Sequence, residues 1–182
     1  KEPVKITGKT RNVKFDNLYI NGSLVLNAGE QPYKNYSEWL THSEMKRVPH
    51  SYLLDFSKKP KWSYVMGIEM EGMLDTYEAY KEGNEAILEY LKEYPQTMID
   101  EKGNITGYKY EDFNLDNVRT AKFILRMHNI APTKGTEKAL KTLFKQLVNQ
   151  PRTKEGVYWH KAIYANQVWL DGIFMGLPFY CN

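Results

Sequence analysis

From about residue 36 onward, apolar residues recur at the three- and four-residue spacing that is typical of amphipathic helices. The spacing predicts helices over residues 37–47, 62–80, 85–100, 117–129 and 136–149, and a last helix that begins at Asn166. Ser37 is expected to cap the first helix, and Pro95 to kink or shorten the third. No segment here alternates like a central strand, so the pattern predicts an all-α fold.

The first 30 residues follow a different pattern. Short apolar segments alternate with polar ones, and Asn21-Gly22 is a strong signal for a hairpin turn. We therefore expect an extended or hairpin-like N-terminal arm over residues 1–30, followed by one helical domain over residues 31–182.

The connections between the predicted helices are of two kinds. Those that precede the helices at about residues 63, 117 and 166 carry aromatic and acidic residues, whereas those before the helices at 85 and 136 are plain. Alternation of this kind is expected when helices alternate between an inner and an outer ring, because functional residues then gather on the loops at one end.

The composition leaves the class of partner open except for two exclusions. With 182 residues, 42% apolar and 26% charged, the chain resembles an ordinary globular domain. Aromatic residues make up 14%, which suits either carbohydrate binding or a well-packed helical core. The net charge is +3 and the densest basic patch, residues 58–61, is short, so we expect no nucleic-acid partner. No apolar run approaches the roughly 20 residues of a membrane span, so we expect no membrane partner either.

No cofactor or metal is predicted. The single cysteine, Cys181, excludes an internal disulfide, and His42, His50 and His128 lack the spacing of metal ligands. The sequence holds no glycine-rich phosphate loop. The chain begins at Lys1 rather than Met, as it would after removal of a leader, which slightly favours a periplasmic over a cytoplasmic location.

One stretch near the end of the chain concentrates unusual residues. Asp171 lies between Leu170 and Gly172, and His160, Trp159 and Trp169 precede it closely. A pocket that stacks aromatic faces on a flat ligand and keeps one acid partly dry would use such residues. The alternative is that Asp171 complements a helix dipole and that the tryptophans are core residues.

Several separate blocks of this sequence resemble the signature of one enzyme family. The blocks are Pro151-Arg152-Thr153, Trp159-His160-Lys161, the run Asn166-Gln167-Val168-Trp169-Leu170-Asp171-Gly172, and the upstream Asn114-Leu115-Asp116-Asn117. In type and order they resemble the unsaturated rhamnogalacturonyl hydrolases and the related unsaturated glucuronyl hydrolases.

The resemblance implies a fold and a set of site residues. The fold is an α/α toroid, a barrel of six helical hairpins, of which this chain would hold about the first three; the remainder of the barrel is then an implied partner. The catalytic residues would be Asp171 and Asp116, which could share one proton and so supply an acid and a base. The implied substrate-binding residues are His160 and Trp169. Trp62 and Tyr64 would either line the mouth or pack in the core.

The implied reaction removes an unsaturated (C4=C5) uronic acid from the non-reducing end of lyase-generated oligosaccharides by hydration of its double bond. Two alternatives stay open: an ordinary inverting glycosidase on an α/α barrel, and a non-catalytic glycan-binding helical module. The sequence departs from the family pattern at Tyr164-Ala165, at Val168 and at residues 118–122. These changes spare both acids but leave the particular substrate open.

Overall fold

The computed structural model describes residues 18–20, 24–26, 33 and 35–181, and the chain divides into two compact units, residues 1–39 and 40–182. In the first unit, strands β1 (Leu18–Ile20) and β2 (Leu24–Leu26) pair antiparallel, with Tyr19 opposite Val25. The expected Asn21-Gly22 turn and most of the arm predicted over residues 1–30 lie outside the described residues.

The described part of the second unit is helical, which confirms the predicted all-α fold. Its helices, of which the first begins just before the division, are α1 (Tyr36–Arg47), α2 (Tyr64–Ala79), α3 (Glu85–Met98), α4 (Asp116–Ile130), α5 (Lys134–Asn149) and α6 (Leu170–Tyr180). Two short 3₁₀ turns, η1 (Ser51–Leu53) and η2 (Tyr110–Asp112), lie in the connections.

Local side-chain chemistry sets several helix ends. The Ser63 hydroxyl accepts a hydrogen bond from the amide of Met66 and caps α2, and Thr133 and Thr136 form a reciprocal capping box on α5. Pro95 lies inside α3, which ends at Met98. The last helix begins at Leu170, so the predicted start at Asn166 is wrong: the backbone of Asn166 is left-handed, with φ of 60°, and cannot form a helical turn.

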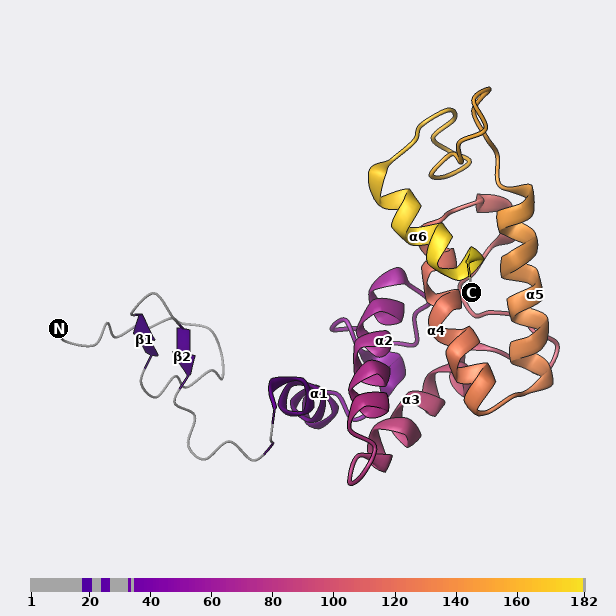
Figure 1. Cartoon of the computed structure of the whole chain (residues 1–182). Helices are drawn as coiled ribbons and strands as arrows, with labels where there is room; N and C mark the ends of the chain where they lie inside the picture. The colour runs from indigo at the N-terminus through magenta and orange to yellow at the C-terminus, as the bar shows by residue number, and fades with distance from the viewer. Residues whose placement is uncertain (1–17, 21–23, 27–32, 34, 182) are drawn as a thin grey trace. The chain divides into compact units, whose positions relative to one another are not determined.

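The helices form two layers. In the inner layer α4 packs between α2 and α6, while α3 packs against α2 and α5 against α4 from outside (Figure 1). Helices α2 and α4 come very close, because a Cβ atom on Gly67 would lie 2.7 Å from the Cα of Thr120. The Thr120 hydroxyl also donates to the carbonyl of Ser63 across this seam, at 2.7 Å. This arrangement confirms the expected alternation of inner and outer helices.

The seam between α2 and α4 also contains a buried ion cluster. Glu71 of α2 pairs with Arg119, and with Lys122 at 3.3 Å and Arg126 at 3.8 Å, all from α4. The Arg119 guanidinium lies over the ring of Phe174 on α6, 4.5 Å from the centroid. One arginine therefore contacts all three inner helices.

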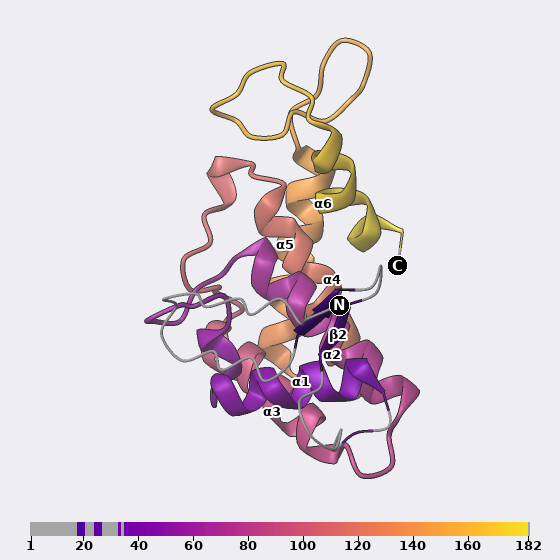
Figure 2. The same ribbon diagram turned by 90° about the vertical axis from the view of Figure 1, so that its left-hand side faces the viewer.

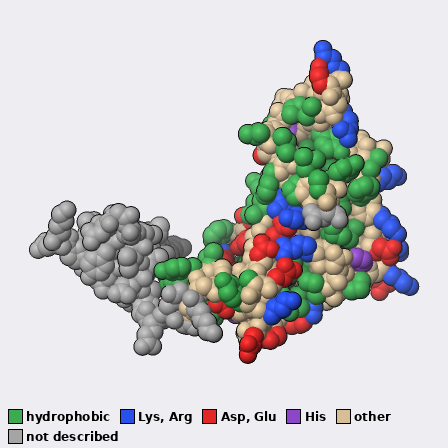
Figure 3. Space-filling model, viewed as in Figure 1, with side chains coloured by type: hydrophobic (Ala, Val, Ile, Leu, Met, Phe, Trp, Pro, Cys, Tyr) green, Lys and Arg blue, Asp and Glu red, His purple; other side chains and the backbone are tan. Residues whose placement is uncertain are grey.

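The buried core lies between the two layers and is built from aliphatic and aromatic residues of α2 to α6 and their connections, including Met70, Leu91, Tyr94, Phe123 and Leu143. The face of α6 that does not pack on the core is exposed and apolar, with Leu170 87% exposed and Ile173 and Phe174 about half exposed (Figure 3). No helix among the described residues has the length and apolar character that would let it cross a membrane.

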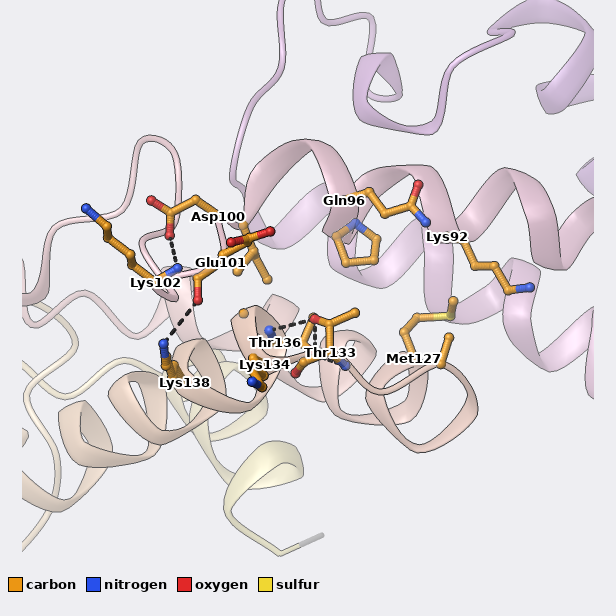
Figure 4. Close-up of a pocket in the computed structure, with 14 residues that line it drawn as sticks. Lys92, Gln96, Asp100, Glu101, Lys102, Met127, Thr133, Lys134, Thr136 and Lys138 are labelled. Atoms are coloured by element: carbon orange, nitrogen blue, oxygen red, sulfur yellow. Dashed lines mark hydrogen bonds between the residues drawn. The ribbon is translucent and has the colours of Figure 1, made fainter.

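The connection between α5 and α6 extends beyond the helix ends in both views (Figures 1 and 2). A separate cavity of about 720 Å³ lies between the C-terminal parts of α3 and α4 and the start of α5. Its walls include the Thr133–Thr136 capping box and a hydrogen bond from Lys138 to the carbonyl of Glu101 (Figure 4). None of the site residues expected from the sequence lines this cavity.

Candidate active site

Asp116 is the first residue of α4, and its backbone is fixed by its neighbours in sequence. The side-chain carbonyl of Asn114 accepts a hydrogen bond from the amide of Asp116 at 3.0 Å, which satisfies one of the free amides at the helix start. Leu115 between them is buried. The short Asn-Leu-Asp sequence thus anchors α4 and leaves the Asp116 carboxylate free for other contacts.

The Asp116 carboxylate contacts two residues of the loop that follows α5. The ammonium group of Lys161 lies 2.8 Å from Oδ2, and Nε2 of His160 lies 3.2 Å from Oδ1. Lys161 is thus a charged partner of Asp116 to which the sequence analysis gave no role, although it belongs to the Trp-His-Lys block.

His160 is the most deeply buried member of the group, with 1% of its surface exposed. Its carbonyl accepts from the amide of Leu115 at 3.0 Å, and its own amide donates to the carbonyl of Gln167 at 2.9 Å. Neither ring nitrogen makes a well-directed hydrogen bond with a described residue, although Nε2 lies within ion-pair distance of Asp116. On the other side, a Cβ atom on Gly172 of α6 would lie 3.1 Å from Nδ1.

Trp169 immediately precedes α6 and covers the imidazole. The two rings are stacked, with centroids 4.3 Å apart and planes 9° apart, and the ring of Tyr164 also stacks on the indole at 5.3 Å. The indole nitrogen donates to the side chain of Gln167 at 3.0 Å. Trp169 remains 39% exposed, so part of its surface is open to a ligand while another part holds His160.

Asp171 lies in the first turn of α6 and is exposed. Within residues 35–181, its carboxylate forms no hydrogen bond or ion pair. One donor atom from each of Asp116, His160 and Asp171 lies within 4.8 Å of the other two. The structure therefore brings together the two acids and the histidine that the sequence singled out, from the starts of two neighbouring inner helices and the loop between them.

The same three donors are of the kind that divalent metals use. The Lys161 ammonium already lies against Asp116, and its positive charge opposes a cation there. For proton transfer, the two carboxylates differ in their neighbours. Asp116 forms ion pairs with Lys161 and His160, whereas the Asp171 carboxylate forms none with a described residue, so the two carboxylates stand in different surroundings.

Trp62 and Tyr64 lie farther from this cluster. The Trp62 indole is buried, stacks on Tyr94 and donates to the carbonyl of Asn117 at 2.8 Å. This placement corresponds to the packing alternative, and it braces the first turn of α4. Tyr64 begins α2 and is more than one third exposed.

Two buried glutamines near the end of α5 escaped the sequence analysis. Gln150 donates from its side-chain amide to the carbonyls of Phe113 at 2.6 Å and Trp159 at 2.8 Å. Gln146 donates to the carbonyl of Asn114 at 3.1 Å and to the Gln150 side chain at 3.2 Å. Their positions continue the apolar stripe of α5, and this is the signal that could have marked them as buried.

Comparison with known proteins identifies the family. A family model described as Glycosyl Hydrolase Family 88 matches residues 36–182. This chain belongs to Glycosyl Hydrolase Family 88. The match confirms the resemblance seen in the sequence, and it includes every site residue discussed above.

A solved structure agrees with the Family 88 assignment. A glycoside hydrolase from family 105 of C. acetobutylicum ATCC 824 is 34% identical and superposes with a TM-score of 0.70. The similarity covers 81% of this chain and 38% of the other, so the Family 88 chain described here spans well under half of that enzyme's length. The inner and outer helices of the chain described here form the first part of an α/α barrel.

Proposed function

We propose that this Family 88 chain carries catalytic residues of a glycoside hydrolase that removes unsaturated uronic acid from the non-reducing end of lyase-generated oligosaccharides. The observation that carries the proposal is the cluster of Asp116, His160 and Asp171, with donor atoms within 4.8 Å, at the starts of adjacent inner helices. Two close carboxylates in different surroundings can supply an acid and a base to one substrate.

Asp171 is the proton donor in this proposal. It is exposed, so a substrate can reach it, and its carboxylate makes none of the ion pairs that Asp116 forms with Lys161 and His160. Its proton passes to C4 of the C4=C5 double bond, and positive charge develops at C5, where the ring oxygen shares it.

Water then adds at C5. Asp116 accepts a proton from that water, helped by Lys161 and His160, which keep the carboxylate oriented. The product is a hemiketal at C5. Its opening breaks the bond between C5 and the ring oxygen and leaves a ketone at C5 and a hemiacetal at C1. The hemiacetal then collapses to an aldehyde and releases the neighbouring sugar as an alcohol. The overall balance is one water consumed, one saturated keto acid formed and one sugar released, with no metal, cofactor or covalent enzyme intermediate.

Trp169 is proposed to bind the sugar ring, because the open part of its indole offers an apolar face. His160 was expected to bind substrate, but both of its ring nitrogens are buried, so its proposed role is to orient the Asp116 carboxylate. Tyr64 is exposed and is proposed to contact sugar at the rim. For Trp62, its buried position supports a bracing role on α4.

The spacing of the two acids is short for an ordinary inverting glycosidase. Inverting enzymes keep their carboxyl groups roughly 6.5–9.5 Å apart to admit a water molecule. One oxygen of Asp116 and one of Asp171 lie within 4.8 Å, so the nearest oxygens of the pair are closer than that range. A purely capping role is also disfavoured for Asp116, because its carboxylate contacts Lys161 and His160 of another loop.

One assay tests the proposal and needs the full-length protein. An oligosaccharide with a terminal unsaturated uronic acid and its saturated analogue are incubated with the enzyme. The ultraviolet absorbance of the double bond should disappear together with release of the adjacent sugar, while the saturated analogue stays intact. Equal cleavage of both substrates would establish the inverting-glycosidase alternative, and binding without turnover would establish the glycan-binding module.

A further inference from the structure

The two loops that carry the candidate site are joined to each other by backbone hydrogen bonds. The amide of Leu115 donates to the carbonyl of His160 at 3.0 Å, and the amide of Ala162 donates to the carbonyl of Asp112 at 3.1 Å. The loop before α4 and the loop before α6 therefore form one hydrogen-bonded unit, and the contact between Asp116 and His160 depends on how the two loops are held.

Gln150 and Gln146, at the C-terminal end of α5, hold the two loops through hydrogen bonds. They bind the carbonyls of Phe113 and Asn114 in the first loop and of Trp159 in the second. Each of these carbonyls lies within three residues of Asp116 or next to His160 in the sequence. A single buried amide, that of Gln150, bridges both loops.

The two amides are fully used. Each side-chain nitrogen donates twice, the Gln150 oxygen accepts from Gln146, and the Gln146 oxygen accepts from the Tyr108 hydroxyl at 2.7 Å. Turning the Gln150 amide over would face its oxygen toward two carbonyl oxygens, so only one orientation satisfies the network. Both residues are buried, with 0% of the surface of Gln146 and 3% of that of Gln150 exposed, so these hydrogen bonds lie in a region of low dielectric.

We infer that Gln150, supported by Gln146, is a positioning residue for the Asp116–His160 pair. It acts on backbone carbonyls and touches none of the reacting groups. The inference rests on the proposed function for its effect on turnover, but its structural part concerns the protein alone. Misplacement of a reacting group by about 1 Å can lower a rate on the order of 10²-fold, so a clamp of this kind is expected to affect turnover.

The test replaces Gln150→Met, which keeps the length of the side chain and removes its hydrogen bonds. Leu143→Ala is the matched control, because Leu143 is buried on α5 and its aliphatic side chain makes no hydrogen bond to the loops, so its truncation destabilises the protein without removing a loop hydrogen bond. Both variants are studied in the full-length protein, at a temperature where circular dichroism shows them folded.

Two readouts separate positioning from stability. The first is kcat on the unsaturated substrate, which should fall about tenfold or more in Gln150→Met and stay within about twofold in Leu143→Ala. The second is the NMR signal of the His160 ring protons without substrate. The stacked indole of Trp169 shifts this signal, and it should move toward the value of an exposed histidine only in Gln150→Met.

The possible outcomes distinguish a failure of the positioning inference from a failure of the proposed function. An unchanged His160 signal with kcat within about twofold in Gln150→Met overturns the inference, and so does an equal loss of kcat in Leu143→Ala. If Gln150→Met does not fold, Gln150→Asn is measured instead, since it keeps a polar amide that is too short to reach both loops. A displaced His160 signal in a protein whose wild type does not turn over the substrate supports the clamp and rejects the proposed function.

Discussion

The imidazole of His160 lies parallel to the indole of Trp169, with centroids 4.3 Å apart. This stack joins a buried loop residue to the residue that precedes α6, the helix of Asp171. It therefore couples the Asp116 side of the site to the Asp171 side through two rings.

The stack predicts unequal effects at Trp169. Trp169→Ala should lower kcat at least about tenfold, because His160 loses the surface that orients it, and should cost about 0.5–1.5 kcal/mol of stability beyond the loss of buried area. Trp169→Phe keeps an aromatic face and should retain most of both. Steady-state kinetics and denaturant unfolding measure the two effects, and equal kinetics for Ala and Phe would show that the ring does not orient His160.

Asp171→Asn should abolish proton donation with little effect on folding. We expect turnover to fall by about 10²–10⁴-fold, the contribution of general acid catalysis. Because Asp171 is exposed and has no partner within the described residues, stability should change by less than about 0.5 kcal/mol. The control is Glu155→Gln, an exposed acid on the preceding loop. Near-normal turnover in a folded Asp171→Asn protein would remove this residue from its role.

Two helical glycines predict opposite outcomes on substitution by alanine. In Gly172→Ala the new Cβ would lie 3.1 Å from Nδ1 of His160, so the ring must shift and turnover should fall several-fold or more. In Gly72→Ala nothing lies within 4 Å, and the protein should gain about 0.4–1 kcal/mol, since the unfolded chain loses freedom. Thermal unfolding and kinetics on both variants test the pair. A harmless Gly172→Ala would mean that His160 has more space than the structure gives it.

Stability should fall at alkaline pH because of buried tyrosines. Burial raises the pKa of Tyr90, Tyr94 and Tyr108 well above the ordinary value near 10, and their hydroxyls donate to Val48, Lys61 and Gln146 respectively. Since the folded pKa is the higher one, their contribution is complete below about pH 10 and is lost as pH rises from there toward the folded pKa.

Urea unfolding at a series of alkaline pH values measures this loss. Tyr108→Phe removes one of the three groups, so its stability should depend less steeply on pH above about 10. An unchanged slope in that variant would contradict the assignment of the loss to Tyr108.

Metal removal should leave the proposed reaction intact. The chemistry uses protons on Asp171 and Asp116, so dialysis against a chelator should not lower kcat. Added Zn²⁺ should inhibit only at high concentration, because Asp116, His160 and Asp171 offer three donors within 4.8 Å while the Lys161 ammonium beside Asp116 opposes a cation there. His160→Gln should weaken that inhibition. Loss of activity on chelation, restored by metal, would overturn the proton-only mechanism.

The sequence predicted the helices well because their signals are local. Apolar spacing and nearby turn residues located α2 to α5 to within a few residues. The start of α6 was misplaced because the turn at Asn166 depends on its surroundings, where the carbonyl of Gln167 accepts from the amide of His160. Nothing within a few residues of Asn166 reveals that bond.

The proximity of the two acids and the histidine was predictable from the sequence, whereas the residues that support them were not. Asp116, His160 and Asp171 stand in motif blocks that can be compared residue by residue. Gln146 and Gln150 contact loops that are 32 and 37 positions away on one side, and in the sequence they resemble ordinary polar residues near a helix end. Long-range pairing of this kind has no local signature.

Gln146 and Gln150, here called the glutamine clamp, donate hydrogen bonds to backbone carbonyl groups, which every residue type possesses. The side chains of Phe113 and Trp159 are thus not specified by the clamp, although their backbones are held in place. Exchange of these side chains should alter the surface of the two loops without dislodging the acids. The fold thereby separates a constant backbone platform from a variable surface, and this is a favourable starting point for selecting or evolving enzymes with new sugar preferences.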